Sequence, residues 1–312
     1  MNIKFPAIRT GFAEPREKQP KVAVMDNFQN AETELAHGEI VEAVMLTHGG
    51  LQEQDIQRYH AESGPFISLQ EVLQAPPHKL LEAYANFTRG ATASFYNMVS
   101  DNLEHVVTQQ PEIKVVNQSQ SLTPARIAEP FLQPVMEDRG FRERLAQRLD
   151  LPADSAGPSV VSKLLRLTET VVAEDKEIQA AANRYEDVSR HAYEKGVVNV
   201  VAAGNQGALA ASLAEQGIDT NASTFRSVLV NDWVTVVGGA TSDGRVSNVT
   251  SPNSGVEVFA LGENVPFKID GQTLSANGTS LSAPLIASYA VQLRDQHPEL
   301  TPSQLEARMK RS

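Results

Sequence analysis

Asn277-Gly278-Thr279-Ser280-Leu281-Ser282-Ala283-Pro284 places a serine between a glycine and an apolar segment, residues 285–293. Gly278 permits a sharp turn. The apolar segment predicts a helix that begins near Ser282, with Pro284 in its first turn. Ser280 would then lie at the mouth of this helix, close to backbone N–H groups and to the positive end of the helix dipole. This position suits a nucleophile that attacks a carbonyl group. It equally suits a hydroxyl that caps a core helix, so the octapeptide alone leaves both interpretations open.

Other segments in the C-terminal third extend the pattern. Residues 197–207 form an apolar run that ends in Ala-Ala-Gly-Asn-Gln-Gly. An apolar segment at 233–240, a serine-rich loop at 247–254 and a second apolar segment at 256–262 then precede the octapeptide. Together with Gly-Thr-Ser-Leu-Ser-Ala-Pro at 278–284, this order resembles that of the subtilases, the subtilisin-like serine proteases. The resemblance is dense from about residue 197 to residue 305.

The resemblance implies roles for two residues in these motifs. Ser280 matches the family's nucleophile. Asn205 matches the asparagine whose amide is the side-chain donor of the oxyanion hole, where the backbone N–H of Ser280 would be the second donor. The family's triad runs Asp, His, Ser along the chain, so the carboxylate and the base are expected in the N-terminal part.

The candidate for the triad carboxylate is Asp26. Residues 21–26 predict a short apolar strand that ends in this acid, which is the position of the aspartate in the family. The family usually continues with Ser or Thr and then Gly, whereas this chain continues with Asn27 and Phe28. An acid at the end of a strand also commonly caps the next helix.

Two histidines compete for the role of the base. His37-Gly38 opens a predicted helix and resembles the family's His-Gly helix start, although the family's second histidine is replaced by Ile40. His48 comes before Gly49, at the predicted end of the same helix, where a histidine interacts favourably with the helix dipole. We prefer His37, because His48 would stand a turn or more away from the place where the base must act.

The substrate-binding residues are expected beside these groups. Residues 113–119 predict a strand, and the resemblance implies that its end pairs with the substrate backbone through Ser119, Gln120 and Ser121. The family has Ser-Leu-Gly there, and the loss of glycine predicts a narrower cleft. Pairing of this kind gives an extended peptide main-chain hydrogen bonds whatever its sequence. Ala203 and Gly204, which precede the oxyanion asparagine, are also predicted to contact substrate.

The predicted fold is α/β. Alternating strand and helix signals indicate a subtilisin-like, doubly wound and mostly parallel sheet with helices on both faces. Residues 1–20 are predicted to form an extended arm, and residues 21–312 a peptidase domain with a helical insertion at about 124–179. The insertion follows the substrate-binding strand, so it is either a lid or exosite beside the cleft or a packing element.

A second region, from about residue 50 to residue 90, also departs from the pattern of small subtilases. Residues 66–73 and 80–84 indicate a strand or turn and short helices, and residues 91–107 indicate a helix.

Composition limits the possible partners and cofactors. The formal net charge of -11 argues against nucleic acid, and the absence of cysteine excludes disulfides and thiolate catalysis. The N-terminus lacks the apolar core of a signal peptide, and nothing approaches the roughly 20 apolar residues of a membrane helix. A cytoplasmic location, or export without a cleaved signal, is therefore predicted. No cofactor or metal is expected; calcium is conceivable, but no ligand cluster is recognised. The oligomeric state stays open.

The sequence therefore predicts a serine endopeptidase that hydrolyses peptide bonds by Ser-His-Asp acyl transfer, with restricted specificity. Its partners would be protein or peptide substrates. The alternative is a weak or inactive binding protein on the same fold, which the departures around Asp26 and His37 favour. The intact motifs at Asn205 and Ser280 favour the enzyme, because a binding protein has no need of both.

Overall fold

Six parallel strands form the central sheet of the computed structural model, in the order β2-β1-β3-β4-β5-β6. The structure describes residues 19–29, 35–61 and 67–311. Most of the predicted N-terminal arm, residues 1–18, thus lies outside the described residues. The strands are β1 (Val22–Asp26), β2 (Ile56–His60), β3 (Val115–Gln118), β4 (Val198–Ala202), β5 (Thr235–Ala240) and β6 (Val258–Leu261). All five strand pairs are parallel.

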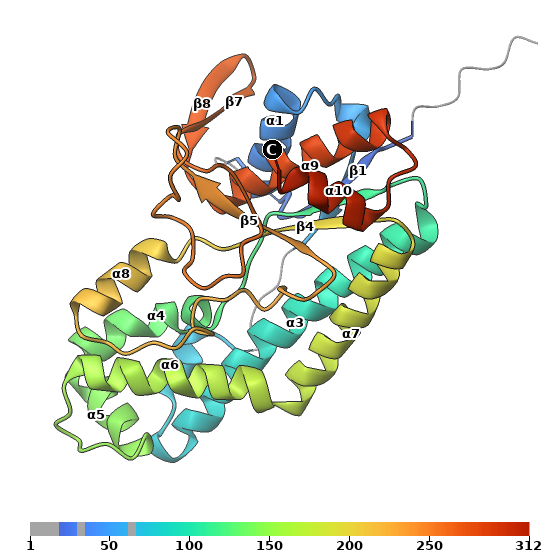
Figure 1. Cartoon of the computed structure of the whole chain (residues 1–312). Coiled ribbons are helices and arrows are strands. Elements are labelled where there is room, and N and C mark those ends of the chain that lie inside the picture. Colours follow the sequence, from blue (N-terminus) through green and yellow to red (C-terminus); the bar gives the residue numbers. More distant parts are fainter. Residues whose placement is uncertain (1–18, 30–34, 62–66, 312) are drawn as a thin grey trace, which may run out of the picture.

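Helices cover both faces of this sheet (Figure 1). On one face lie α1 (His37–His48), α9 (Thr279–Gln296) and α10 (Pro302–Met309); on the other lie α3 (Leu80–Gln109) and α7 (Lys176–Glu194). Side chains of a strand point alternately to opposite faces. Val22 and Val24 of β1 accordingly join the core under α9, whereas Ala23 and Met25 join the core under α3 and α7. Burial on both faces explains why the inner strands β1, β4 and β5 read as largely apolar runs. The doubly wound α/β prediction is confirmed.

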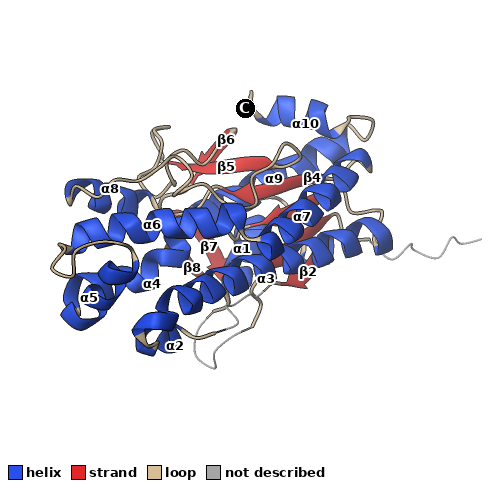
Figure 2. Ribbon diagram, turned by 90° about the horizontal axis from the view of Figure 1, so that it is seen from below, coloured by secondary structure: helices blue, strands red, loops and turns tan. Residues whose placement is uncertain are grey.

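A helical lobe extends from one end of the sheet. It contains α2 (Leu69–Gln74), α4 (Pro124–Glu137), α5 (Arg139–Arg148), α6 (Gly157–Glu174), α8 (Gly207–Glu215) and the N-terminal part of α3. Figures 1 and 2 both place α4, α5, α6 and α8 together at this end. Phe131 of α4 packs edge-on against Tyr84 and Phe87 of α3, with ring centroids 5.0 and 5.1 Å apart. The two regions that depart from the family pattern thus share one hydrophobic core.

The predictions for the lobe were partly wrong in detail. Leu80 opens a single helix of 30 residues, so residues 80–84 and 91–107 do not belong to separate elements. Strand β2, at the edge of the sheet, was not predicted at all. Gln179, the predicted end of the insertion, lies inside α7. The description of residues 124–179 as an insertion into a domain of residues 21–312 stays a prediction.

A small antiparallel hairpin leads to the nucleophile motif. It consists of β7 (Val265–Ile269) and β8 (Gln272–Ala276), which pair with each other. Val265 and Phe267 of β7 pack against Ala43 and Val44 of α1. The hairpin thereby holds the chain just before Gly278 against the helix that carries His37. Short 3₁₀ turns at Glu53–Asp55 and Pro77–Lys79 complete the elements of the described residues.

Helix α9 begins at Thr279, three residues earlier than predicted. The first N–H group of the helix has its hydrogen-bond acceptor in a distant segment of the chain. Thr279 N donates to Asn205 Oδ1 at 2.8 Å. A cap of this kind is invisible in the local sequence. As a result Ser280 lies inside the first turn, and Pro284 lies in the second turn rather than the first. Because proline has no N–H group, it donates no helical hydrogen bond to the carbonyl of Ser280.

Two further features are absent from residues 19–29, 35–61 and 67–311. No three or more His, Asp or Glu side chains in these ranges lie together in a way that could hold a metal ion. No helix there combines the length and the apolar character needed to cross a membrane.

Candidate active site

A cleft of about 720 Å³ opens at the carboxyl edge of the sheet. Strand order reverses between β1 and β3, because β1 pairs with β2 on one side and with β3 on the other. In open α/β sheets, ligands bind outside the carboxyl ends of the strands at such a reversal. The cleft lining includes His37, Ser280 and Asn205, as well as the segment Ser119–Ser121. Four separate parts of the chain therefore meet here.

Asp26 and His37 form the first pair of the site. Asp26 ends β1 and is completely buried. Its Oδ1 lies 2.8 Å from His37 Nδ1 and also accepts a hydrogen bond from Asn27 N at 2.7 Å. The His37 side chain keeps 42 % of its surface exposed. The carboxylate thus fixes one ring nitrogen of an imidazole that still borders the cleft.

Gly38 explains how α1 can begin so close to the end of β1. Its N–H donates to Asn27 O at 2.8 Å. A β-carbon on Gly38 would lie 2.7 Å from the Phe28 ring and 2.9 Å from Asn27 O, closer than real side chains come. Only glycine permits this approach, which places His37 beside Asp26.

The protonation of His37 is set mainly by burial and by Asp26. Burial lowers the pKa of His37, but the hydrogen bond to Asp26 and the negative charge of Asp26 together raise it by more. The net pKa therefore lies above the usual value for histidine. Asp26 favours the imidazolium form, which is the form that arises when a base accepts a proton.

Ser280 and Asn205 flank one small space next to Gly278. Ser280 is 7 % exposed. Gly278 has a φ of 152°, which disfavours residues with side chains. A β-carbon at Gly278 would lie 3.0 Å from Ser280 Oγ and 3.1 Å from Asn205 Nδ2. Because glycine has no β-carbon, no side chain of residue 278 enters the space between Ser280 Oγ and Asn205 Nδ2.

Thr279 fixes the orientation of the Asn205 amide. Asn205 Oδ1 accepts hydrogen bonds from Thr279 N at 2.8 Å and from Thr279 Oγ1 at 2.9 Å. Thr279 Oγ1 also accepts from Gly204 N at 3.1 Å. With its oxygen engaged, the side chain presents Nδ2 to the space beside Ser280. The Ser280 N–H belongs to the first turn of α9, whose N–H groups have no partner within the helix.

His48 lies at the other end of α1. It is the last residue of the helix, and its Nε2 is 2.5 Å from Pro266 O of the hairpin. The cleft lining does not include it. The arrangement therefore favours His37 over His48 as the base.

The predicted substrate-binding residues divide into two groups. Ser119, Gln120 and Ser121 line the cleft. Ala203 and Gly204 are buried and do not line it. The reason is that Ala203 continues the direction of β4, and its N–H donates to Val237 O of β5 at 2.9 Å.

The lobe supplies cleft residues that the sequence motifs did not indicate. Arg126 and Glu129 come from α4, and Ala208 and Leu209 come from α8. Arg126 and Glu129 form an ion pair with a distance of 2.6 Å. The only available signal was that α4 and α8 directly follow the segments ending in Ser121 and Asn205.

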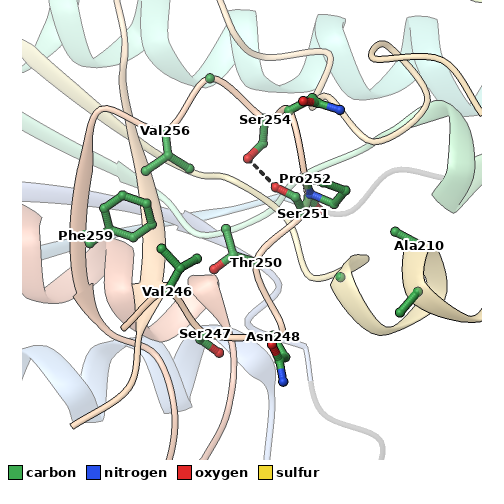
Figure 3. Close-up of a pocket in the computed structure, with 14 residues that line it drawn as sticks. Ala210, Val246, Ser247, Asn248, Thr250, Ser251, Pro252, Ser254, Val256 and Phe259 are labelled. Atoms are coloured by element: carbon green, nitrogen blue, oxygen red, sulfur yellow. Dashed lines mark hydrogen bonds between the residues drawn. The ribbon is translucent and has the colours of Figure 1, made fainter. Parts of the chain in front are cut away.

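A second hollow of about 630 Å³ lies on the other side of the start of α8 (Figure 3). Ala210 faces it from the helix, and Val246, Val256 and Phe259 form an apolar group across from the helix. Ser251 lines this hollow, and Gln206 lines the cleft. The Ser251 hydroxyl donates a hydrogen bond of 2.8 Å to Gln206 Oε1. The two hollows thus adjoin at one hydrogen-bonded pair.

Comparison with known families identifies the class of this fold and site. The Subtilase family model, Peptidase_S8, matches residues 93–312. The chain therefore belongs to the subtilase family, and it is a subtilisin-like serine peptidase. The matched range contains Asn205 and Ser280. Asp26 and His37 lie before it, so their place in the site rests on the geometry alone.

Three solved structures are similar to this chain. MycP1 from the ESX-1 type VII secretion system has a TM-score of 0.50 and 18 % identity, over 93 % of this chain and 73 % of that chain. MycP1 from Mycobacterium smegmatis has a TM-score of 0.49 and 18 % identity, over 93 % and 72 %. The prenylagaramide maturation protease PagA has a TM-score of 0.45 and 14 % identity, over 92 % and 80 %. At such low sequence identities, structural similarity is evidence of a shared fold only. The similarity to the first of these structures confirms the predicted subtilisin-like fold.

Proposed function

We propose that this peptidase is an endopeptidase whose triad is Asp26, His37 and Ser280, with Asn205 in the oxyanion hole. One observation carries the proposal. A histidine bonded to a buried carboxylate, a serine in the first turn of a helix and an oriented amide all converge on one cleft. These are the parts that acyl transfer needs, namely a nucleophile, an oriented base and donors for the developing negative charge.

The reaction follows from these positions. Ser280 Oγ attacks the peptide carbonyl carbon while His37 Nε2 accepts the hydroxyl proton. The carbonyl oxygen becomes an oxyanion and accepts hydrogen bonds from Asn205 Nδ2 and from the Ser280 N–H. His37 then gives its proton to the leaving amine as the C–N bond breaks, and water hydrolyses the acyl-enzyme by the same steps. Because the base must begin neutral, activity should fall as the pH drops through the raised pKa of His37.

Protein or peptide substrates follow from the family, and the lobe supports restricted specificity. Arg126 and Glu129 of α4 and Leu209 of α8 form part of the cleft, so the substrate must fit between the sheet edge and the lobe. Elements that cover a cleft restrict entry to flexible or specifically docked chains. We therefore expect poor cleavage of folded proteins and of bulk casein, with cleavage of a mixed peptide library at few sites.

The ion pair on α4 offers a direct test of restricted specificity. Arg126→Ala combined with Glu129→Ala should increase the number of library sites that are cleaved. The matched control is Arg139→Ala with Glu143→Ala, which removes an exposed ion pair of the same 2.6 Å distance on α5. An unchanged site profile for the first pair would remove the lobe from substrate selection. Deletion of the lobe is less informative, because it would expose the apolar side chains that α3 contributes to the shared core.

A fluorophosphonate probe separates the enzyme from a binding protein on the same fold. Such probes bond to the oxygen of a base-activated serine, with loss of fluoride. The wild-type chain should be labelled at Ser280 within minutes, and Ser280→Ala should not be labelled. An unlabelled wild-type chain would favour the inactive alternative. Localisation in the cytoplasm, or export without a cleaved signal, stays a prediction.

A further inference from the structure

Gln120 joins two sides of the cleft. Its Nε2 donates a hydrogen bond of 2.8 Å to Ala61 O, and both residues line the cleft. Gln120 follows β3, and Ala61 follows β2. The strand between them, β1, ends at Asp26. The Gln120–Ala61 bridge therefore passes from one side of β1 to the other, at the edge of the sheet where β1 carries the triad carboxylate.

The bridge lies beside the segment along which a peptide can pair. Gln118 is the last residue of β3 that pairs with β1 and with β4. Residues 119–121 continue beyond the sheet, and their backbone can pair with an extended peptide. Such a peptide would lie next to Gln120, whose side chain takes part in the bridge.

The proposed reaction decides which part of the substrate meets the bridge. The carbonyl carbon at Ser280 has three substituents. Its oxygen must face Asn205, and its leaving nitrogen must face His37. The third substituent, the α-carbon of the residue that supplies the carbonyl, is then directed to the wall formed by Ser119–Ser121. The residues before the scissile bond therefore continue along this wall.

We propose that the Gln120–Ala61 bridge limits the number of residues that bind before the scissile bond. The proposal rests on the proposed function. A strand advances about 3.3 Å per residue, so each further residue before the scissile bond brings the chain nearer to the bridge. Peptides with few residues before the cleaved bond should then bind without opening the bridge. Longer substrates must first break the bridge, after which their own backbone can donate to Ala61 O.

The bridge should act on binding rather than on chemistry. A single hydrogen bond between neutral groups has a modest net strength, corresponding to about five- to tenfold in an equilibrium constant. Side chains change rotamer far faster than peptidases turn over. The cost of opening should therefore appear in KM for long peptides and leave kcat little changed.

The test uses peptides that share one core sequence and carry one, two, four or six residues before the cleaved bond. For the wild type, kcat/KM should fall about five- to tenfold between two successive lengths of this series, mainly through KM. Gln120→Glu keeps the size of the side chain but cannot donate a hydrogen bond to Ala61 O. In this variant kcat/KM should therefore no longer fall with peptide length. The same is expected of Gln120→Ala. In Gln133→Ala, which loses a hydrogen bond on the exposed surface of α4, the fall should remain.

The possible outcomes separate the bridge from simple crowding. If kcat/KM still falls with peptide length in Gln120→Glu and no longer falls in Gln120→Ala, the bulk of the side chain narrows the cleft rather than the hydrogen bond. The proposal would then be wrong. Equal kcat/KM for all lengths in the wild type would overturn it too. Cleavage of the shortest peptide that is lost in Ser280→Ala shows that the proposed function holds in either case.

Binding gives a readout that does not depend on cleavage. In the Ser280→Ala background, fluorescence anisotropy with dye-labelled peptides should give a Kd that rises with length. Adding Gln120→Glu should abolish the rise. A rise that persists in the double variant would contradict the bridge even if no peptide were cleaved by the wild type.

Discussion

Ser280→Ala and His37→Ala should each lose peptide hydrolysis by about a millionfold in kcat, the loss established for the corresponding residues of subtilisin and carried over from it here. Without Ser280 Oγ no acyl-enzyme can form. Without His37 the hydroxyl keeps its proton and remains a weak nucleophile. Because the two groups act as a unit, the double variant should be no slower than either single one. The measurement is kcat for one cleaved peptide in all three variants.

His48→Ala is the matched control for the histidine. It removes a contact with Pro266 O at the far end of α1, so most activity should remain, with a small loss of thermal stability. Ser280→Ala should unfold at nearly the wild-type temperature, because a single hydroxyl contributes little to packing. Activity that survives in His37→Ala but disappears in His48→Ala would show that the first fifty residues are wrongly assigned, including the role of Asp26.

Asn205→Ala should lower kcat by about 100- to 1,000-fold with little change in KM. This range is the one known for the oxyanion asparagine of subtilisin. The reason is that Asn205 Nδ2 donates to a charge that exists only in the transition state. A raised KM with normal kcat would show instead that the amide binds the ground state.

Asn205 also holds the start of α9, so stability must be measured beside activity. Asn205→Ala leaves Thr279 N without its acceptor, which should cost about 1 kcal/mol. Asn205→Asp keeps an oxygen for Thr279 but has no N–H to donate. It should therefore lose activity while its unfolding temperature stays closer to that of the wild type.

The features that the sequence indicates most directly are those contained in a few consecutive residues. The motifs at Asn205 and Ser280 combine a strand end or a helix start with residue types that few other roles require. Asp26 and His37 could be proposed because β1 and α1 have clear apolar patterns. Their pairing needed the close approach at Gly38, which is a property of the fold.

The parts that sequence missed depend on contacts between distant residues. The early start of α9 comes from Asn205, 74 residues before Thr279. The Gln120–Ala61 bridge joins residues 59 apart. Ala203 is buried by its pairing with Val237 of β5, so its contact with substrate stays a prediction. Local patterns contain no information on such partners.

Helix α3 has a consequence for how the molecule responds to heat. Its N-terminal part supplies Leu80, Tyr84 and Phe87 to the lobe core, and its C-terminal part supplies Val99 and Leu103 to the core beneath the sheet. One continuous helix therefore belongs to both cores. If the lobe unfolded alone, the loss of helical structure in α3 would extend to the residues that it contributes to the core beneath the sheet. The lobe and the sheet should therefore unfold in a single cooperative transition. We therefore expect a lobe coupled in this way to act as a fixed wall of the cleft and not as a hinged flap.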